Sequence, residues 1–374
     1  MESVSADNSS GQLNTRREFM PAGIVEYRRP IVAEERVIPW QSAVRVMHSA
    51  VSVVELRQVK VLCDARMVCI YDDVHGVYQD LSLESEAVDF DRFLKVPVRQ
   101  VPGTTAMFHQ LDAYSYYHWL IDTLPCFGVL EMAGHTVSEM DQLYIHRSDS
   151  GFQQKMLSAL GIDPATLLSY EGQRLHLEFE HLVLPFFRLD GASWPHPWCA
   201  GYLKHELWPR FNSNGPRLER IDIDARSGEY RKLYVARGNA RRRVLNESEL
   251  ISRLRDEGYS ILSADNSSFE EQARMMNQAD LVLAAHGAGL ANMVFCEPGT
   301  RIIEFGGHYL TTHFRMLSEY ADLEYRSFAA GIDENGRRLN VTPDGSVRSE
   351  DFHVDIDEIL RQSNAFADAD TRFS

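Results

Sequence analysis

The feature that most constrains this chain is an apolar run, Leu281–Ala285, that ends in a glycine turn. The turn consists of His286, Gly287, Ala288 and Gly289. A short helical segment follows, then a Pro-Gly turn and a second apolar run, Ile302–Phe305. A strand, a glycine turn, a helix and a strand in this order present main-chain N–H groups at a helix N-terminus, where they bind anions. The sequence therefore predicts a site for a phosphorylated ligand.

The composition is that of a globular protein with an acidic surface. Its 374 residues suffice for two domains, each with its own core. A formal net charge of −16 argues against nucleic-acid binding, which needs a basic face. Five cysteines form no CxxC pair, which indicates reduced, buried thiols. Because we find no signal peptide and no apolar segment of membrane-spanning length, we expect a cytoplasmic protein.

The C-terminal half alternates strand patterns with helix patterns. Strand-length apolar runs lie at Leu233–Ala236, Tyr259–Leu262, Leu281–Ala285, Ile302–Phe305 and Leu323–Phe328. Asn246 with Glu249 resembles a capping box for a helix to about residue 257, and Ser268 with Glu271 one for a helix to about residue 278. Short connections between these elements predict a parallel sheet covered on both faces, with ligands beyond the carboxyl ends of its strands.

The N-terminal half is less regular. Its candidate elements are strands at Val51–Leu56, Val59–Cys63, Met67–Tyr71, Leu143–His146 and Leu182–Leu184, and helices at Tyr117–Ala133 and Phe152–Leu160. This pattern predicts a β-rich opening followed by α/β structure. The fold class is therefore α/β, with two α/β domains that face each other across a cleft.

The domain boundaries follow from polar segments. Residues 1–18 are poor in large apolar side chains and are predicted to be a disordered tail. The charged segment Phe211–Arg231, which contains glycine and proline, is the predicted linker. We therefore expect an N-terminal domain over 19–225, a C-terminal ligand-binding domain over 226–350, and a helix near Ile356–Gln362 with a tail over 351–374.

The glycine turn departs from the dinucleotide fingerprint GxGxxG, because Asn292 stands where the third glycine would be. Glycines allow the main chain to approach a phosphate closely, so residues 286–289 and Asn292 are candidate ligand contacts. Glu304, near the end of the next strand, is a candidate contact to a ribose hydroxyl. The alternative for the glycine turn is a tight connection that binds no ligand. The alternative for Glu304 is a position at a solvated strand end.

An arginine cluster follows the strand at Leu233–Ala236. It comprises Arg237, Arg241, Arg242 and Arg243, in a chain that is otherwise acidic. A guanidinium donates two parallel hydrogen bonds to phosphate and stays charged. Because parallel strands end at one sheet edge, we favour pyrophosphate binding by Arg237 and Arg242 over a solvated basic loop. Arg243 is expected to support the fold.

A third motif, YYHWLIDTLP, starts at Tyr116. His118 and Asp122 are four residues apart, so they share one helix face and can form a general-base pair or a substrate clamp. Tyr117 and Trp119 are aromatic surfaces of the kind on which sugars stack. The alternative is a structural helix whose histidine and aspartate hold neighbouring loops.

Metal binding is poorly supported by the sequence, which contains no HExxH motif and no Cys/His cluster. The DxD spelling of Asp222–Asp224 falls in the predicted linker, so we expect no metal ligand there. His196 lies between two prolines and two tryptophans, in WPHPW. It is a candidate contact to an acceptor, although a stiffened loop explains it as well.

Together the three motifs resemble glycosyltransferase family 61, which includes plant xylan xylosyl- and arabinosyltransferases, animal O-linked N-acetylglucosaminyltransferases and a bacterial polysaccharide-biosynthesis branch. The family pattern runs YYHWLxDxLP, RxxxxRRxLNE and HGAGLxNxxFxxPGTxxIE, and this sequence supplies all three in order, from Tyr116 to Glu304. The resemblance implies a GT-B architecture of two Rossmann-like domains, a nucleotide-sugar donor, inversion at the anomeric carbon and no obligatory metal or other cofactor.

The resemblance also gives the residues roles. Asp122 or His118 would remove the proton of the acceptor hydroxyl, and Arg237, Arg242 and the amides after His286 would stabilise the leaving diphosphate. The donor is expected to be a UDP-sugar and the acceptor a soluble or lipid-linked glycan, contacted by Tyr117, Trp119 and His196. Lipid-linked acceptors would place the enzyme at the inner face of the membrane. The sequence leaves open whether the enzyme forms a homo-oligomer.

Two other functions compete with this one. An NAD-dependent oxidoreductase would also use the glycine turn, but the turn lies late in the chain and lacks the full fingerprint. Glu304 falls short of the spacing at which such enzymes carry an acidic residue. A non-catalytic nucleotide- or glycan-binding protein is disfavoured by His118, Asp122 and Arg237.

Overall fold

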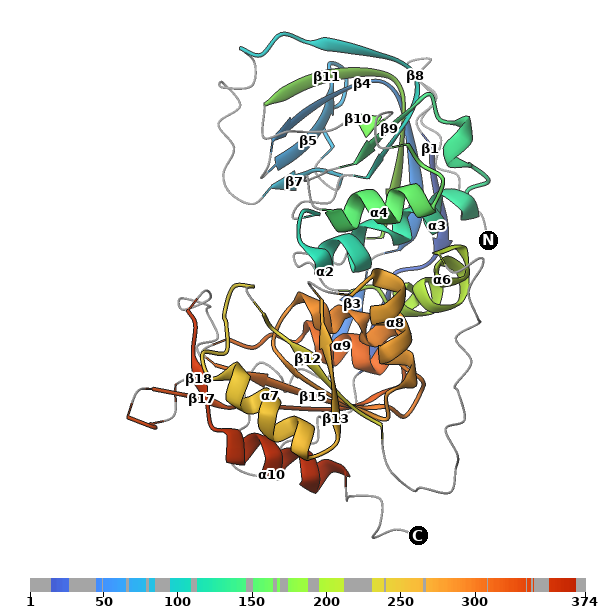
Figure 1. The fold of residues 1–374 in the computed structure, drawn as a ribbon. Helices are drawn as coiled ribbons and strands as arrows, with labels where there is room; N and C mark the ends of the chain where they lie inside the picture. The colour runs from blue at the N-terminus through green and yellow to red at the C-terminus, as the bar shows by residue number, and fades with distance from the viewer. Residues whose placement is uncertain are drawn as a thin grey trace. The chain divides into compact units, whose positions relative to one another are not determined.

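The computed structural model describes residues 15–26, 45–48, 50–64, 67–78, 81–84, 95–108, 113–145, 151–163, 167–168, 174–187, 195–211, 231–238, 240–264, 267–307, 309–333, 335–337, 339 and 350–367. The chain forms two compact units (Figure 1). Unit 1 combines residues 1–24 with 47–196, and unit 2 combines residues 25–46 with 197–374. None of the described helices is long and apolar enough to cross a lipid bilayer.

Unit 1 is built on a sheet of nine strands with mixed directions. The strands are β1 (Thr15–Met20), β4 (Val51–Asp64), β5 (Met67–Asp72), β6 (Gly76–Val77), β7 (Leu83–Glu84), β8 (Arg99–Phe108), β9 (Gln142–Ile145), β10 (Leu167–Leu168) and β11 (Leu175–Phe186). β11 runs parallel to β8 but antiparallel to β4. The N-terminal domain, expected to be Rossmann-like, is parallel only in part: β10, β9, β8 and β11 are parallel, whereas β4 pairs antiparallel with both β11 and β5. Only two residues join β4 to β5, and so short a connection permits antiparallel pairing alone.

The two runs predicted at Val51–Leu56 and Val59–Cys63 form the single strand β4. They are separated at Gln58, whose φ of 52° interrupts the pairing with β11. The first residues of β1 pair with Glu55 and its neighbours, so the predicted disordered tail extends too far. Residues 1–14 lie outside the described residues.

The helix predicted at Tyr117–Ala133 consists of three segments: α2 (Tyr116–His118), the π-helix η2 (Trp119–Thr123) and α3 (Pro125–Met132). Pro125 has no N–H group, and the N–H of Leu124 donates to Trp119 O at 2.9 Å, five residues back. Among the described residues of unit 1, η3 (Val137–Glu139) and α4 (Gly151–Ala159) are further helices.

Unit 2 contains the predicted parallel sheet, which is confirmed. Its strands, in spatial order, are β13 (Tyr259–Ser263), β12 (Lys232–Ala236), β14 (Leu281–Ala285), β15 (Arg301–Gly306) and β16 (Glu324–Ala329). Every neighbouring pair is parallel. Continuous apolar runs are typical of strands buried on both faces, so these strands could be located from the sequence. Two short pairs lie outside the two large sheets: β2 (Gly23–Glu26) with β3 (Arg45–His48), and β17 (Gly331–Ile332) with β18 (His353–Val354).

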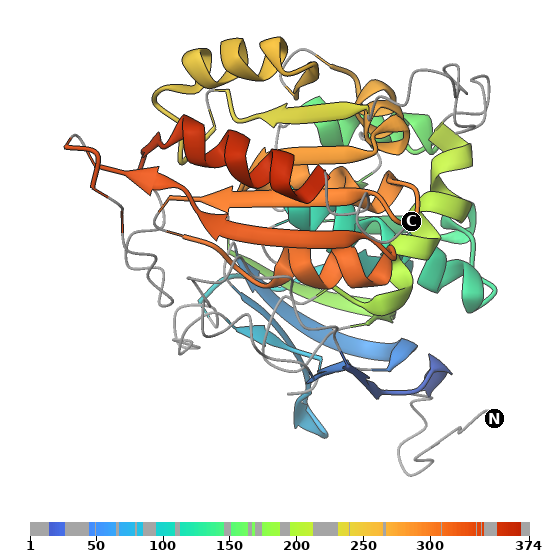
Figure 2. The same cartoon turned by 90° about the horizontal axis from the view of Figure 1, so that it is seen from below.

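Helices cover both faces of this sheet. α7 (Glu247–Asp256) and α10 (Ile356–Ala367) share one apolar core with the strands, and α10 lies along the sheet (Figure 2). The other face carries α8 (Phe269–Gln278), the 3₁₀ helix η6 (Ala288–Phe295) and α9 (His313–Tyr320) (Figure 1). α10 extends beyond the predicted end at residue 362, because Phe366 is buried in the core.

The two predicted capping boxes have different outcomes. Ser268 accepts from Glu271 N at 3.1 Å and caps α8 as expected. Asn246 makes no side-chain cap to α7. Its amide instead pairs with the main chain of Val354 in both directions, at 2.9 Å each. The side chain thus ties the start of α7 to β18.

The larger segment of unit 2 begins at Pro197, before the predicted boundary at 225. The helices α5 (Pro197–Gly201), η5 (Tyr202–Leu207) and α6 (Trp208–Phe211) belong to it. Trp208 holds them there, since its ring packs on Phe269 and Phe295 with centroid distances of 5.7 and 5.5 Å. Most of the predicted linker, residues 212–230, lies outside the described residues. All five cysteines are buried thiols that form no disulfide bond, as predicted.

We expect Glu55 to stabilise unit 1 in a pH-dependent way. Its carboxylate bonds His181 at 2.9 Å and His135 at 3.3 Å, and the His181 bond is the main cause that lowers its pKa from 4.5 to about 2. A lowered carboxyl pKa stabilises the fold fully above the unfolded value of 4.5 and loses this effect as the pH falls towards 2.

Glu55→Gln should therefore lower the free energy of unfolding by about 2 kcal/mol at pH 7, with a smaller difference at pH 3. Urea unfolding at both pH values measures this. Glu18→Gln on β1, whose side chain is 41% exposed, is the control and should change little. A difference for Glu55→Gln that is the same at both pH values would contradict this account.

Candidate active site

The candidate site lies where the strand order of unit 2 reverses. β12 is followed in sequence by β13 on one side, whereas the next strand, β14, lies on the other side of β12. In open parallel sheets, ligands bind beyond the carboxyl ends of the strands at this reversal. The arginine cluster leaves the end of β12 and the glycine turn leaves the end of β14. The structure therefore brings these two predicted motifs to one place.

Glu247, in the first turn of α7, holds the start of the arginine loop. Its carboxylate accepts from Arg237 N at 2.6 Å, from Gly238 N at 3.0 Å and from the Tyr234 hydroxyl at 2.9 Å. Burial raises the pKa of Tyr234 well above its usual value, so the hydroxyl stays protonated and remains a donor. The main chain of Arg237 is thus fixed. Its guanidinium also bonds its own loop, through Nε to Arg242 O at 3.4 Å and through Nη2 to Arg241 O.

The guanidinium of Arg237 lies directly against Gly287. A Cβ atom at residue 287 would lie 2.6 Å from Arg237 Cζ and closer still to Nη1. Gly287 has an extended φ of 173°, which any residue can adopt, so glycine is needed here for space. Gly289 is different, because a Cβ there would meet only Val235, at an ordinary 3.5 Å. The first glycine of the turn therefore makes room for the arginine.

The positive charge of this loop is concentrated. Burial, followed by the nearby Arg242, lowers the pKa of Arg237 to about 10, which leaves it protonated at neutral pH. Arg242 has a φ of 61° and places its guanidinium over the Tyr309 ring at 5.2 Å. Arg237 and Arg242 are both positively charged, and Arg237 is partly buried. An anion between the two guanidinium groups is therefore favoured.

Arg243 has the structural role expected of it. Its guanidinium pairs with Asp351 at 2.6 and 2.8 Å, and its main-chain N–H donates to the same carboxylate at 2.8 Å. This pair fastens the arginine loop to the segment that leads into α10. Arg243 therefore supports the fold and does not share the ligand-binding role expected of Arg237.

Three polar side chains form a buried chain across neighbouring strands. Tyr325 of β16 donates to Glu304 of β15, and the other carboxylate oxygen of Glu304 bonds Nδ1 of His286, after β14. Burial raises the pKa of Tyr325 well above its usual value, which keeps the hydroxyl a donor. The His286 ring also packs edge-on against Tyr309 and Phe314, at 5.1 and 5.4 Å. His286 is thus fixed in orientation at the mouth of the glycine turn.

Two predicted ligand contacts are corrected by burial. Glu304 is 0% exposed and is engaged by His286 and Tyr325, so it positions His286 and does not reach a ribose. Asn292 is also 0% exposed and donates to Gln272 of α8 at 3.0 Å. Ala288 and Gly289, by contrast, are partly exposed at the start of η6. The first N–H groups of a helix lack partners within it, so these two remain suited to an anion.

In unit 1, His118 and Asp122 form the predicted pair. His118 Nδ1 lies 2.6 Å from Asp122 Oδ2, and the two side chains are 21% and 11% exposed. A carboxylate bonded to Nδ1 orients an imidazole and stabilises its protonated form. The pair can therefore take up a proton, although the contact alone does not assign the role.

The three residues predicted to contact the acceptor are all buried. Trp119 is 0% exposed, and its indole N–H points to Met156 Sδ at 3.1 Å. Tyr117 is 6% exposed and packs edge-on against His118. His196 is 2% exposed and packs against Phe187. These residues are core, and Tyr114, at 52% exposed, is the open aromatic of this segment.

Metal sites were also considered. Within the described part of the chain, no group of three or more His, Cys, Asp or Glu side chains is placed to hold a metal ion. Asp222–Asp224 lies outside the described residues.

Sequence reasoning missed three residues of the site: Glu247, Tyr309 and Tyr325. Glu247 has a usable signal, since an acidic residue in the first turn of the helix after a basic loop can bond the loop amides. Tyr309 and Tyr325 have no such signal, because their contacts depend on packing between strands far apart in sequence.

Comparison with known proteins agrees with these motifs. The family model for glycosyltransferase 61 matches residues 116–303, which is 188 of 374 residues. Alpha-1,3-arabinosyltransferase XAT3 of rice (Oryza sativa subsp. japonica) is 32% identical over 177 residues, or 42% of this chain and 29% of the rice protein. The EGF domain-specific O-linked N-acetylglucosamine transferase of Drosophila melanogaster is 23% identical over 240 residues, or 61% of this chain and 46% of the fly protein.

Beta-1,2-xylosyltransferase RCN11 of rice is 36% identical over 61 residues, which cover 16% of this chain and 11% of that protein. This chain thus spans less than half the length of each of these relatives. The family model nevertheless covers half of the chain and includes His118, Arg237 and the glycine turn. The chain belongs to glycosyltransferase family 61.

Proposed function

We propose that this chain is an inverting glycosyltransferase that moves a sugar from a nucleoside diphosphate to a hydroxyl of a glycan or glycoconjugate. One observation carries the proposal: the guanidinium of Arg237 lies against Gly287 at the strand reversal of a parallel sheet. This contact combines a cation, a close approach of the main chain and the start of a helix. These are the elements that bind a diphosphate.

The reaction requires charge stabilisation at the leaving group. The acceptor oxygen attacks the anomeric carbon, the bond from that carbon to the phosphate oxygen breaks, and the electron pair leaves with the diphosphate. Arg237, Arg242 and the amides of residues 288 and 289 are positioned donors for this charge. Because two guanidinium groups supply it, the proposal includes no obligatory metal.

The proton of the acceptor hydroxyl also needs a destination. We assign it to His118, with Asp122 holding Nδ1 so that Nε2 faces the acceptor as the base. Unit 1 would then supply the base and unit 2 the donor site, as in the proposed GT-B arrangement. The buried Tyr117, Trp119 and His196 support unit 1 and are left out of the acceptor site.

The relatives narrow the substrates. Their names describe transfer of arabinose, xylose and N-acetylglucosamine. We propose a UDP-linked pentose or N-acetylhexosamine as donor and a glycan of polysaccharide biosynthesis as acceptor. A cytoplasmic location, peripheral attachment to the membrane and a homo-oligomer are further parts of the proposal.

The NAD-dependent oxidoreductase is the weaker alternative. Its fingerprint needs an acidic side chain on the ribose hydroxyls after the second strand. The nearest candidate, Glu304, is fully buried and already bonds two partners. A non-catalytic nucleotide-binding protein would bind UDP without hydrolysing a donor, so the assays below separate it from an enzyme.

Arg237→Ala should lower kcat/KM for the donor about a hundredfold, which corresponds to roughly 3 kcal/mol of lost transition-state stabilisation. UDP-sugar hydrolysis and the UDP-induced shift of the melting temperature measure this. The control is Arg241→Ala in the same loop. The Arg241 side chain is exposed, so this variant should keep donor turnover. Unchanged kcat/KM in Arg237→Ala would refute the assignment.

Gly287→Ala should destabilise unit 2 and weaken UDP binding, because the new Cβ atom collides with the Arg237 guanidinium. The double variant Arg237→Ala/Gly287→Ala removes the collision, so it should recover the melting temperature without recovering UDP binding. Differential scanning calorimetry with and without UDP measures both effects. Additive losses of stability in the double variant would show that the two residues do not share this contact.

Asp122→Asn should lower kcat/KM for transfer by about two to four orders of magnitude. The asparagine amide no longer favours the His118 tautomer that carries its proton on Nδ1 and leaves Nε2 free to act as the base. The UDP-induced shift of the melting temperature should stay unchanged, because Asp122 is not among the proposed diphosphate contacts. His353→Gln, an exposed histidine of β18, is the control. An unchanged kcat/KM for transfer in Asp122→Asn would contradict this role of the pair.

A further inference from the structure

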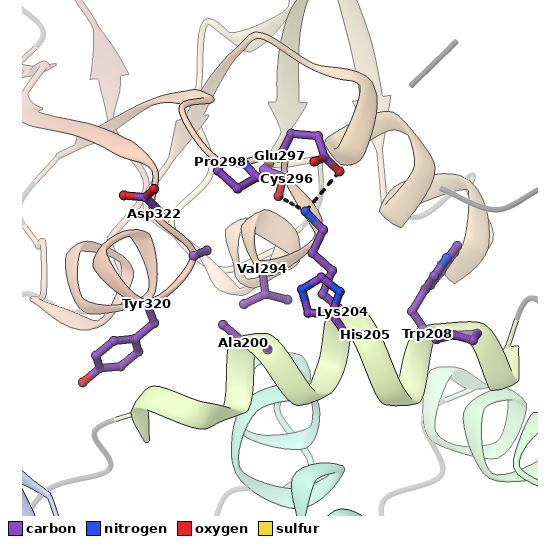
Figure 3. Close-up of a pocket in the computed structure, with 13 residues that line it drawn as sticks. Ala200, Lys204, His205, Trp208, Val294, Cys296, Glu297, Pro298, Tyr320 and Asp322 are labelled. Atoms are coloured by element: carbon purple, nitrogen blue, oxygen red, sulfur yellow. Dashed lines mark hydrogen bonds and ion pairs between the residues drawn. The ribbon is translucent and has the colours of Figure 1, made fainter. Parts of the chain in front are cut away.

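The charged side chains near the two edges of the C-terminal sheet differ in how they are paired. At the amino ends of β15 and β16, Lys204 lines a cavity of about 520 Å³ (Figure 3). Its ammonium donates to Cys296 O at 2.7 Å and pairs with Glu297 Oε1 at 3.1 Å. Lys204 therefore has its acceptors within the fold, whereas the ring of His286, at the carboxyl edge, has a different arrangement.

One ring nitrogen of His286 is bonded inside the sheet and the other is not. Nδ1 bonds the carboxylate of Glu304, which is 0% exposed. In the described part of the chain, no hydrogen bond involves Nε2. The His286 side chain is only 7% exposed, so few water molecules can reach it. A ligand atom at Nε2 would therefore supply a hydrogen bond that the ring lacks within the fold.

His286 lies among the groups proposed to hold the diphosphate. The two nitrogens are on different sides of the imidazole ring, so Nε2 points away from Glu304. The ring packs against Tyr309 at 5.1 Å, and the Arg242 guanidinium lies over the same tyrosine at 5.2 Å. The next residue, Gly287, lies against the Arg237 guanidinium. An anion held by the two arginines is thus beside the His286 ring.

The sheet and α9 place charges of both signs on the Nδ1 side of the ring. Glu304 of β15 carries the carboxylate, and Tyr325 of β16 donates to its other oxygen. Burial and then Glu304 raise the pKa of Tyr325 well above its usual value, while Arg315 of α9 acts in the opposite direction. Arg315 is 3% exposed, so its charge partly balances that of Glu304.

The arginine loop adds two positive charges near the ring. Arg237 and Arg242 stay protonated at neutral pH, so in the free protein they oppose a further positive charge on His286. A bound diphosphate reverses this effect, because it brings negative charge to the same place. The ring then has a carboxylate at Nδ1 and a phosphate oxygen near Nε2. Both acceptors are satisfied only when both ring nitrogens carry a proton.

We propose that His286 takes up a proton when a nucleoside diphosphate binds, and that Nε2–H then donates to a phosphate oxygen. The proton comes from water and returns to water when the diphosphate leaves. Glu304 is the positioning residue, because it orients the ring and favours its protonated form. During transfer the same N–H group stabilises the charge of the leaving diphosphate. The inference rests on the proposed function in one respect, namely that the ligand is a diphosphate.

Isothermal titration of the full chain with UDP, in buffers of different ionisation enthalpy, measures the proton uptake. At pH 7.5 the terminal phosphate of UDP is already largely ionised, so its own protons contribute little. The wild-type chain should take up part of one proton. Its affinity for UDP should rise as the pH falls, by at most about tenfold per pH unit, which is the limit for one coupled proton.

Two variants separate the roles of the ring and of the carboxylate. His286→Asn keeps an N–H donor for Glu304 but has no atom at the position of Nε2. It should lose the proton uptake and bind UDP about tenfold more weakly. The matched control is the same substitution at His353, an exposed residue of β18. Glu304→Gln keeps an acceptor for Nδ1 but removes the charge, so its proton uptake should require a lower pH.

Proton uptake that disappears in His286→Asn and persists in His353→Asn supports the inference. It is overturned when the wild-type chain binds UDP without taking up a proton, or when His286→Asn takes up as much as the wild type. An unchanged pH dependence in Glu304→Gln would contradict the positioning role. Proton-coupled binding of UDP without hydrolysis of any UDP-sugar would end the proposed function and leave this inference intact.

Discussion

The contact between the Arg237 guanidinium and Gly287 is the constraint on which the candidate site depends. It requires a residue without a side chain at 287, and it requires Glu247 to hold the main chain of the arginine loop at the end of β12. Both conditions come from the parallel sheet, which brings the loops after the neighbouring strands β12 and β14 to one edge. Without the contact, the arginine cluster would be a flexible basic loop and the glycine turn an ordinary connection.

The buried chain of Tyr325, Glu304 and His286 makes the other side of this site rigid. A carboxylate inside a sheet is costly unless its oxygens are bonded, and here each oxygen has a partner. The chain links β16, β15 and the turn after β14, so a change at any of the three strands would reorient His286. Polar groups fully satisfied in this way fix one arrangement of a core.

The sequence predicted the C-terminal sheet and the meeting of Arg237 with the glycine turn, because continuous apolar runs mark buried strands and consecutive parallel strands end at one edge. It could not predict the mixed sheet of unit 1, where pairing direction depends on connection length and long-range contacts such as β4 with β11. Glu304 and Trp119 were misjudged for a related reason. A single polar or aromatic residue does not reveal which face of its element is covered, and that depends on helices distant in sequence.

The two edges of the C-terminal sheet differ in charge, and the fold itself explains this difference. In a parallel sheet, helix N-termini with their partial positive charge gather at the carboxyl edge, and helix C-termini gather at the amino edge. Arg237 and Arg242 add to the positive edge, whereas basic and acidic residues are mixed at the amino edge, where Lys232 and Arg301 begin strands and Lys204 pairs with Glu297. An acidic chain can thus attract a diphosphate, since screening confines electrostatic attraction to within about 10 Å and the local arginines outweigh the distant carboxylates.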